Sequence, residues 1–101
     1  MEKIFEKVVQ IVSEYTGASV NDILTGKTEQ CVNCRAILVS SLYALGFNDT
    51  SIAQYLNLTR QGVNKLRNSL PYRKKHNLIL STTCQQISNH LATEKLISNL
   101  N

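Results

Sequence analysis

Residues 52–66 read IAQYLNLTRQGVNKL, and the spacing of the apolar side chains in this stretch indicates how the chain folds. Two helices that cross closely need a small residue at the crossing, and Ala53 occupies that position. Asn57, four positions later, is one of the few non-glycine residues that tolerate the positive φ of a sharp turn. Six positions beyond, the β-branched Val63 is placed to pack the second helix onto the first. The other apolar residues between the helices are Ile52, Leu56, Leu58 and Leu66.

This pattern, over about residues 49–70, closely resembles the helix-turn-helix of bacterial DNA-binding proteins. Thr59 is a natural N-cap for the second helix, which in such motifs presents its N-terminal residues to base edges in the major groove. Arginine pairs bidentately with guanine, and asparagine or glutamine with adenine. The residues that we expect to contact DNA here are Thr59, Arg60, Gln61, Gly62, Asn64, Lys65 and Asn68. The alternative is that Arg60 and Lys65 are solvated charges and Gln61 an ordinary surface amide.

The charge of the chain is unevenly distributed. Residues 1–49 hold four basic and six acidic side chains, whereas residues 50–93 contain no Asp or Glu. The basic residues of this second segment are Arg60, Lys65, Arg67, Arg73, Lys74 and Lys75. A surface of one sign attracts polyanions, of which DNA is the densest in a cell. We therefore expect double-stranded DNA as the partner and no membrane, because the basic segment lacks Trp and an interfacial apolar face.

Helical periodicity extends over the rest of the chain, which predicts an all-α fold of about five to six helices. Residues 4–15 place Ile4, Val8, Ile11, Val12 and Tyr15 on one stripe, and Gly17 ends that helix. Ser19 opens a short helix that contributes Ile23 and Leu24 to the core. The length of 101 residues suits a single domain over residues 1–101.

A long helix is expected over about residues 29–45, with Gly46 as its left-handed C-cap. Asn48 and Asp49 are candidate N-caps for the first helix of the motif. The apolar stripes of the long helix contain Val32, Ala36, Val39 and Tyr43, and beside them Leu38, Leu42 and Leu45.

The second helix of the motif is expected to stop before Pro71, because a proline disfavours helical backbone in the residue before it. The segment PYRKKHN (residues 71–77) follows, and its Arg73, Lys74 and Lys75 either grip backbone phosphates or belong to a solvated connecting loop. A last amphipathic helix is predicted over about residues 80–99. Its buried edge contains Leu80, Cys84, Ile87 and Leu91.

The order of these elements adds a second resemblance. A long helix, a short helix opened by SVNDIL, a polar loop and a long helix containing NCRAILVSSLYALG precede the motif. This order is similar to the DNA-binding C-terminal domain (domain IV) of the bacterial replication initiator DnaA, in the Trp-repressor-like group, over about residues 4–70. In that family an arginine near the start of the long middle helix contacts DNA, which assigns this role to Arg35.

The sequence also departs from that family. The initiator opens its recognition helix with a signature close to RDHTTV, whereas this chain has LTRQGV with one residue fewer between the apolar positions that flank the turn. No GxxxxGK[ST] nucleotide-binding motif is present. The resemblance therefore implies a bacterial DNA-binding module standing alone, in transcription regulation, DNA replication or mobile-element maintenance, with its own target sequence.

The spacing of the three cysteines does not predict a metal or redox centre. Cys31 and Cys34 form a CVNC pair, but Cys84, His76 and His90 supply no second closely spaced pair. No α/β pattern of the thioredoxin kind accompanies the pair, so we expect neither a metal nor a cofactor. An odd number of cysteines and the absence of a signal peptide predict a reduced, cytoplasmic protein. The sequence contains no cluster of carboxylates and no activated nucleophile, so it does not predict an enzyme.

Two points are left open by the sequence. The alternative function is a protein-interaction module that uses the basic face of a helix-turn-helix scaffold to dock an acidic partner. The C-terminal helix either closes the core of its own chain or forms a homodimer surface. The apolar residues that would form that surface are Leu91, Leu96, Ile97 and Leu100.

Overall fold

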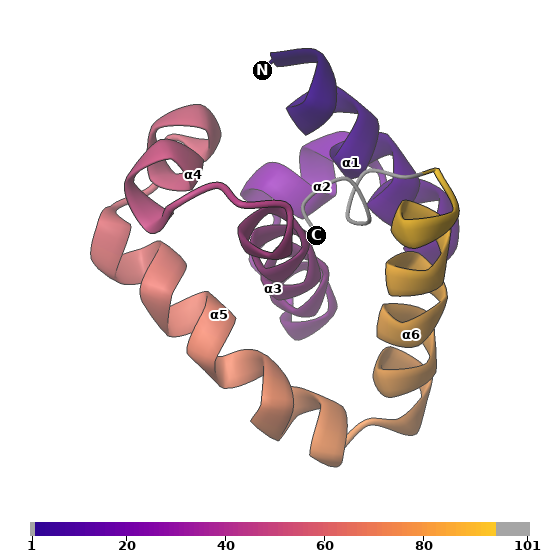
Figure 1. Cartoon of the computed structure of the whole chain (residues 1–101). Coiled ribbons are helices and arrows are strands. Elements are labelled where there is room, and N and C mark those ends of the chain that lie inside the picture. Colours follow the sequence, from indigo (N-terminus) through magenta and orange to yellow (C-terminus); the bar gives the residue numbers. More distant parts are fainter. Residues whose placement is uncertain (1, 95–101) are drawn as a thin grey trace.

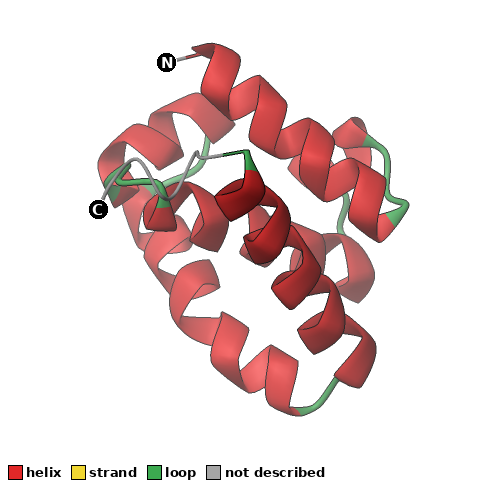
Figure 2. Ribbon diagram, turned by 45° about the vertical axis from the view of Figure 1, so that its right-hand side comes forward, coloured by secondary structure: helices red, strands yellow, loops and turns green. Residues whose placement is uncertain are grey.

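Helix α3 (Glu29–Ala44) runs through the middle of the molecule, and the other five helices all contact it (Figure 1). The computed structural model describes residues 2–94, which form six helices and no strand, as the all-α prediction required. Short loops join the helices (Figure 2). The flanking helices are α1 (Glu2–Thr16), α2 (Val20–Thr25), α4 (Asp49–Leu56), α5 (Arg60–Lys75) and α6 (Leu78–Thr93).

The central position of α3 explains its sequence. A helix that is covered on several sides needs apolar residues around most of its circumference. Its buried residues are Cys34, Ala36, Ile37, Leu38, Val39 and Leu42. The stripe predicted for this helix was wrong at one end, because Tyr43 is 47% exposed and contacts Arg67 of α5 with its ring.

The apolar face of α1 is rotated from the predicted stripe. Ile4 and Tyr15 lie at its exposed edge, whereas Phe5 and Val9 belong to the core with Val8, Ile11 and Val12. Phe5 is placed there by other aromatic rings, since its centroid lies 4.0 Å from that of Tyr55 in a stacked arrangement and 4.7 Å from that of Phe47. Both partners are far from α1 in the sequence, Tyr55 on α4 and Phe47 in the loop before α4, so periodicity within α1 gives no information about these pairs.

Side-chain caps define where the helices begin. Ser19, Asn48 and Thr59 each accept a hydrogen bond from the backbone N–H three residues later, as predicted. Thr28 and Asn77 do the same for α3 and α6. Gly46 has the predicted left-handed backbone, with φ of 104°, and the Phe47 N–H donates to the Leu42 carbonyl across the turn.

The connection between α4 and α5 has the predicted backbone. Asn57 adopts φ 57° and ψ 45°, and the following Leu58 N–H donates to the Ala53 carbonyl at 2.9 Å. Ala53 and Val63 are buried where the two helices meet. Ile52 and Leu56 are also buried, and Leu58 and Leu66 pack partly buried against the core.

Because Asn57 has a positive φ, its replacement by alanine is expected to lower the free energy of unfolding by about 1 kcal/mol. Asn57→Gly is the matched control and should be close to neutral, since glycine has no Cβ to strain this backbone. Urea denaturation at constant m-value measures both variants. Equal losses in the two variants would mean that the asparagine side chain, and not the positive φ, is the feature that matters.

Helix α5 corrects the prediction that it stops before Pro71. It continues through Pro71 to Lys75, so residues 71–75 are helical and not a loop. Proline deprives the helix of one backbone N–H, and the packing of α5 on α3 and α6 compensates for that loss. Leu70 is buried beside Pro71, and the Arg73 Nε donates a 2.8 Å hydrogen bond to the Ser69 hydroxyl across the proline.

Helix α6 begins at Leu78, two residues earlier than predicted. Its predicted edge of Leu80, Cys84, Ile87 and Leu91 is buried, so Leu91 belongs to the core of its own chain. Residues 95–99 of the predicted helix, with Leu96, Ile97 and also Leu100, lie outside the described residues. Across residues 2–94, no helix has the length and hydropathy required to cross a membrane.

Candidate nucleic-acid interface

Helix α5 has one face in the protein and one face in solvent. Its buried face carries Val63 and Leu70. The opposite face is an exposed stripe with helical spacing, about 24 Å long if it follows all 16 residues of the helix. The stripe residues are Arg60, Gln61, Asn64, Lys65, Asn68, Tyr72 and Lys75. The structure thus brings together on one surface the five side chains predicted to face outward, with Lys75 further along.

The N-terminus of α5 is accessible and is shaped by two of the predicted residues. The hydroxyl of the exposed Thr59 accepts a 2.9 Å hydrogen bond from the Gly62 N–H. A Cβ at the half-buried Gly62 would lie 3.0 Å from that same oxygen, so glycine leaves room for the cap. The first turn of α5 contains no acidic residue, and its backbone N–H groups give this end of the helix a partial positive charge.

A surface hollow of about 610 Å³ lies beside this end of α5. It is lined by Asp49, Arg60, Gln61, Asn64 and Lys65. Four of these residues were predicted to contact DNA. Asp49 was predicted only as a candidate cap, yet Asn48 is the cap and Asp49 is the first residue of α4.

Asp49 joins α4 to α5 through Arg67. The Arg67 Nε donates to Asp49 Oδ1 at 3.2 Å, and Nη2 donates to Oδ2 at 3.0 Å. The Arg67 guanidinium also lies over the Tyr43 ring, with Cζ 3.9 Å from its centroid. The two charged side chains are only 23% and 17% exposed. Sequence reasoning missed this pairing, because it requires the crossing of α4 and α5 to bring residues 18 positions apart together.

The ion pair predicts a pH dependence. Hydrogen bonds from Arg67 lower the pKa of the Asp49 carboxyl, and Asn64 adds to the effect. A carboxyl with a lowered pKa in the folded state stabilises the protein above its unfolded pKa of about 3.9, and this contribution is lost as the pH falls through the folded value. Asp49→Asn should therefore cost about 1 kcal/mol at pH 7 and progressively less below pH 4.

Urea denaturation of both proteins at pH 7 and pH 3 measures this difference. Glu14→Gln, at an exposed carboxylate on α1, is the control and should change little at either pH. A stability difference for Asp49→Asn that is the same at both pH values would contradict an electrostatic role for the carboxylate.

Two predicted DNA-binding arginines are directed into the protein. Arg73 Nη1 donates to Glu29 Oε1 at 2.6 Å and to Asn33 Oδ1 at 2.8 Å, both on α3. Arg35 donates to the carbonyls of Ile23 and Gly26 at 2.8 and 2.6 Å and so closes the C-terminal end of α2. Neither guanidinium belongs to the exposed stripe. Lys74 is half-buried and lines a cavity of about 210 Å³ between α3, α5 and α6.

The cysteines and histidines lie apart from the stripe. Cys34 and Cys84 are buried, which raises the pKa of both thiols, and Cys31 is half-buried. His76 caps the C-terminus of α5. His90 Nδ1 is hydrogen-bonded to the Tyr15 hydroxyl at 2.8 Å. Within residues 2–94, no three His, Cys, Asp or Glu side chains are grouped to hold a metal ion.

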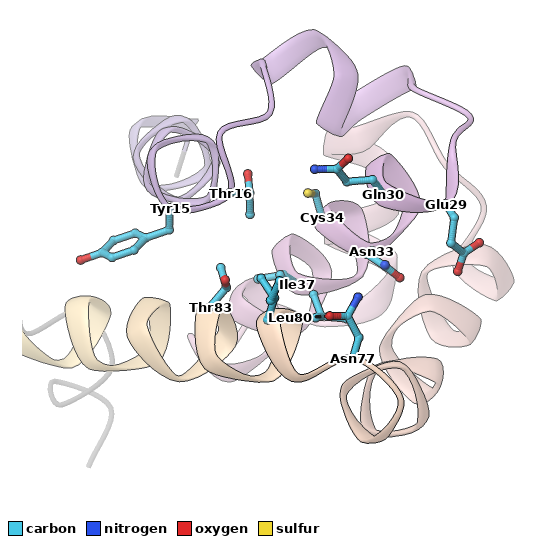
Figure 3. Close-up of a pocket in the computed structure, with 11 residues that line it drawn as sticks. Tyr15, Thr16, Glu29, Gln30, Asn33, Cys34, Ile37, Asn77, Leu80 and Thr83 are labelled. Atoms are coloured by element: carbon cyan, nitrogen blue, oxygen red, sulfur yellow. Dashed lines mark hydrogen bonds between the residues drawn. The ribbon is translucent and has the colours of Figure 1, made fainter.

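A second hollow, of about 460 Å³, lies between α1, α3 and α6 (Figure 3). Cys34, Ile37 and Leu80 give it an apolar part, and the polar side chains around it are Thr16, Glu29, Gln30, Asn33, Asn77 and Thr83. It contains none of the residues predicted to bind DNA. Glu29 and Asn33 are the partners of Arg73, so this hollow adjoins the interface between α3 and α5.

The chain matches no protein-family model, no curated protein and no solved structure. Its function is therefore inferred from the chemistry of the exposed stripe and from the pairing of Asp49 with Arg67.

Proposed function

We propose that α4 and α5 form a helix-turn-helix and that the protein binds double-stranded DNA sequence-specifically, with α5 in the major groove. The observation behind this proposal is the exposed stripe of Arg60, Gln61, Asn64, Lys65 and Asn68. These side chains begin at the N-terminus of α5, which is the end that such motifs direct at base edges. Their chemistry suits guanine, adenine and phosphate oxygen.

The distribution of charge supports the same proposal. Arg67 and Arg73 are paired with Asp49 and Glu29, and both pairs bind α5 to neighbouring helices. Arg60, Lys65 and Lys75 remain exposed along the stripe. These exposed cations, together with the partial positive charge at the N-terminus of α5, favour contacts with backbone phosphates.

The biological role that fits this proposal is that of a small DNA-binding module, as a regulator or as an accessory of replication or mobile-element maintenance. The resemblance to the C-terminal domain of DnaA suggests this range of roles. It also suggests a DNA contact by Arg35, but two carbonyls hold that guanidinium and the proposal does not depend on it.

Selection against a pool of random DNA duplexes tests the proposal, and a salt titration on the enriched sequence then counts the phosphates contacted. We expect one enriched motif and a slope of log K against log salt of about −0.9 for each phosphate contact. A palindromic motif would indicate a homodimer on two half-sites. Salt-sensitive binding without an enriched sequence would contradict base reading. No binding even at low salt would favour the alternative of a basic face that docks an acidic protein.

A further inference from the structure

The orientation of the Asn64 side chain is set by its neighbours. Its Nδ2 donates to Asp49 Oδ2 at 3.3 Å, and its Oδ1 accepts a hydrogen bond from Asn68 Nδ2 at 3.0 Å. Asn64 is exposed on α5, and both contacts lie in or beside the hollow that Arg60, Gln61 and Lys65 line. The amide therefore occupies the middle of the surface proposed to face the bases.

Asp49 gives this arrangement a direction. An ionised carboxylate only accepts hydrogen bonds, so it must face the NH₂ group of Asn64 and cannot face its oxygen. The Asn64 oxygen then lies on the other side, where the NH₂ group of Asn68 donates to it. Rotating the Asn64 amide by 180° would set oxygen against carboxylate and nitrogen against nitrogen, and both hydrogen bonds would be broken.

Arg67 holds the carboxylate in place. It donates to both oxygens of Asp49, and its guanidinium is itself held by the Tyr43 ring. Asp49 Oδ2 is thus shared between Arg67 and Asn64. Arg67 fixes the orientation of the Asp49 carboxylate from below the exposed stripe, and the carboxylate in turn fixes the orientation of Asn64 on the stripe.

We infer that Asp49 is a positioning residue that orients Asn64 to read an adenine in the major groove. This inference rests on the proposed function. The NH₂ group of Asn64 makes one hydrogen bond to Asp49, and its oxygen accepts one from Asn68. One N–H and one oxygen lone pair of the amide therefore remain available to a base. Adenine presents a matching pair in the major groove, the N7 acceptor and the N6 donor, whereas guanine presents two acceptors. An oriented amide therefore distinguishes an A·T pair from a G·C pair at one position.

Duplex selection with four variants tests this inference, each compared with the wild-type base preferences. Asn64→Ala should lose the adenine preference at one position, about 5- to 150-fold, and keep the preferences elsewhere. Asp49→Asn should lose much of the preference at that same position, because an amide at residue 49 both donates and accepts and so no longer orients Asn64. Combining the two substitutions should cost no more at that position than Asn64→Ala alone.

Arg67→Met separates positioning from bracing. It removes the ion pair and both hydrogen bonds that hold the carboxylate, but it leaves an acceptor-only carboxylate beside Asn64. It should therefore lower stability and retain part of the adenine preference, more than Asp49→Asn retains. Asn64→Ala leaves the Asp49–Arg67 pair intact, so the position that it reads is identified even if Asp49→Asn folds poorly. The side-chain amide protons of Asn64 give a second readout by NMR, with one of them shifted and slowed in exchange in the wild type and not in Asp49→Asn.

The outcomes distinguish the inference from the function on which it rests. If the wild type enriches no sequence, the proposed function fails and the inference fails with it. If the wild type enriches a site and Asp49→Asn keeps the adenine preference that Asn64→Ala loses, the inference alone is overturned. If Arg67→Met loses as much of the adenine preference as Asp49→Asn, the preference depends on the ion pair and not on the carboxylate that faces Asn64, and the inference is also overturned.

Discussion

Replacing Arg60 and Gln61 by alanine is expected to weaken binding to the preferred duplex. Each lost hydrogen-bonded base contact should cost about 1–3 kcal/mol, which is about 5- to 150-fold in affinity. Both side chains are exposed at the start of α5 and line the same hollow. Because each is exposed, its removal should leave the free energy of unfolding within about 0.5 kcal/mol of the wild type. Fluorescence anisotropy with labelled duplex at one fixed salt concentration measures the change in affinity.

The control for this experiment is Lys27→Ala. Lys27 is an exposed cation between α2 and α3, outside the proposed reading surface, so its removal should weaken binding only slightly. A scrambled duplex of the same length separates base reading from attraction to phosphate. If the variants lose equal affinity for the preferred and the scrambled duplex, Arg60 and Gln61 contact only the backbone, and the assignment of base reading to them is wrong.

Ile52→Ala is expected to lower the free energy of unfolding by about 2–5 kcal/mol, through the reduced burial of apolar surface and the cavity left behind. Ile52 is fully buried, and α4 packs on both α3 and α5. A decrease of this size is a large fraction of the total stability of a small domain. Chemical denaturation followed by circular dichroism measures it.

Ile79→Ala provides a matched control, because it is the same substitution at a position 80% exposed on α6. Its effect should stay within about 0.5 kcal/mol. Equal effects of the two substitutions would contradict the burial of α4 against α3 and α5, and with it the positioning of α5 by a packed partner helix.

Local features of the fold could be predicted well from the sequence. The positive φ of Asn57, the caps at Ser19, Asn48 and Thr59, and the turn at Gly46 all depend on residues within a few positions of one another. The burial of Ala53 and Val63 follows from the same short-range spacing. The side chains that α5 exposes between Arg60 and Asn68 could be predicted too, because helical periodicity assigns the two faces of that part of the helix.

Contacts between distant segments could not be predicted in the same way. The pairing of Arg67 with Asp49, and of Arg73 with Glu29, requires the packing of α5 on α4 and α3. The packing of α5 on α3 and α6 carries the helix through Pro71, against the local preference of proline. Charge counting therefore overestimated the free cations, since two arginines of the acid-free segment are paired with carboxylates outside it.

The most direct test of DNA binding by α5 is to titrate ¹⁵N-labelled protein with the enriched duplex and to map the backbone and side-chain amide shifts. The proposal predicts that the largest shifts cluster between Thr59 and Asn68, with smaller shifts at the start of α4. The amides of α1, and those around the hollow between α1, α3 and α6, should change little. Shifts centred on α1 or α6, with the N-terminal half of α5 unchanged, would contradict the proposal that α5 contacts DNA.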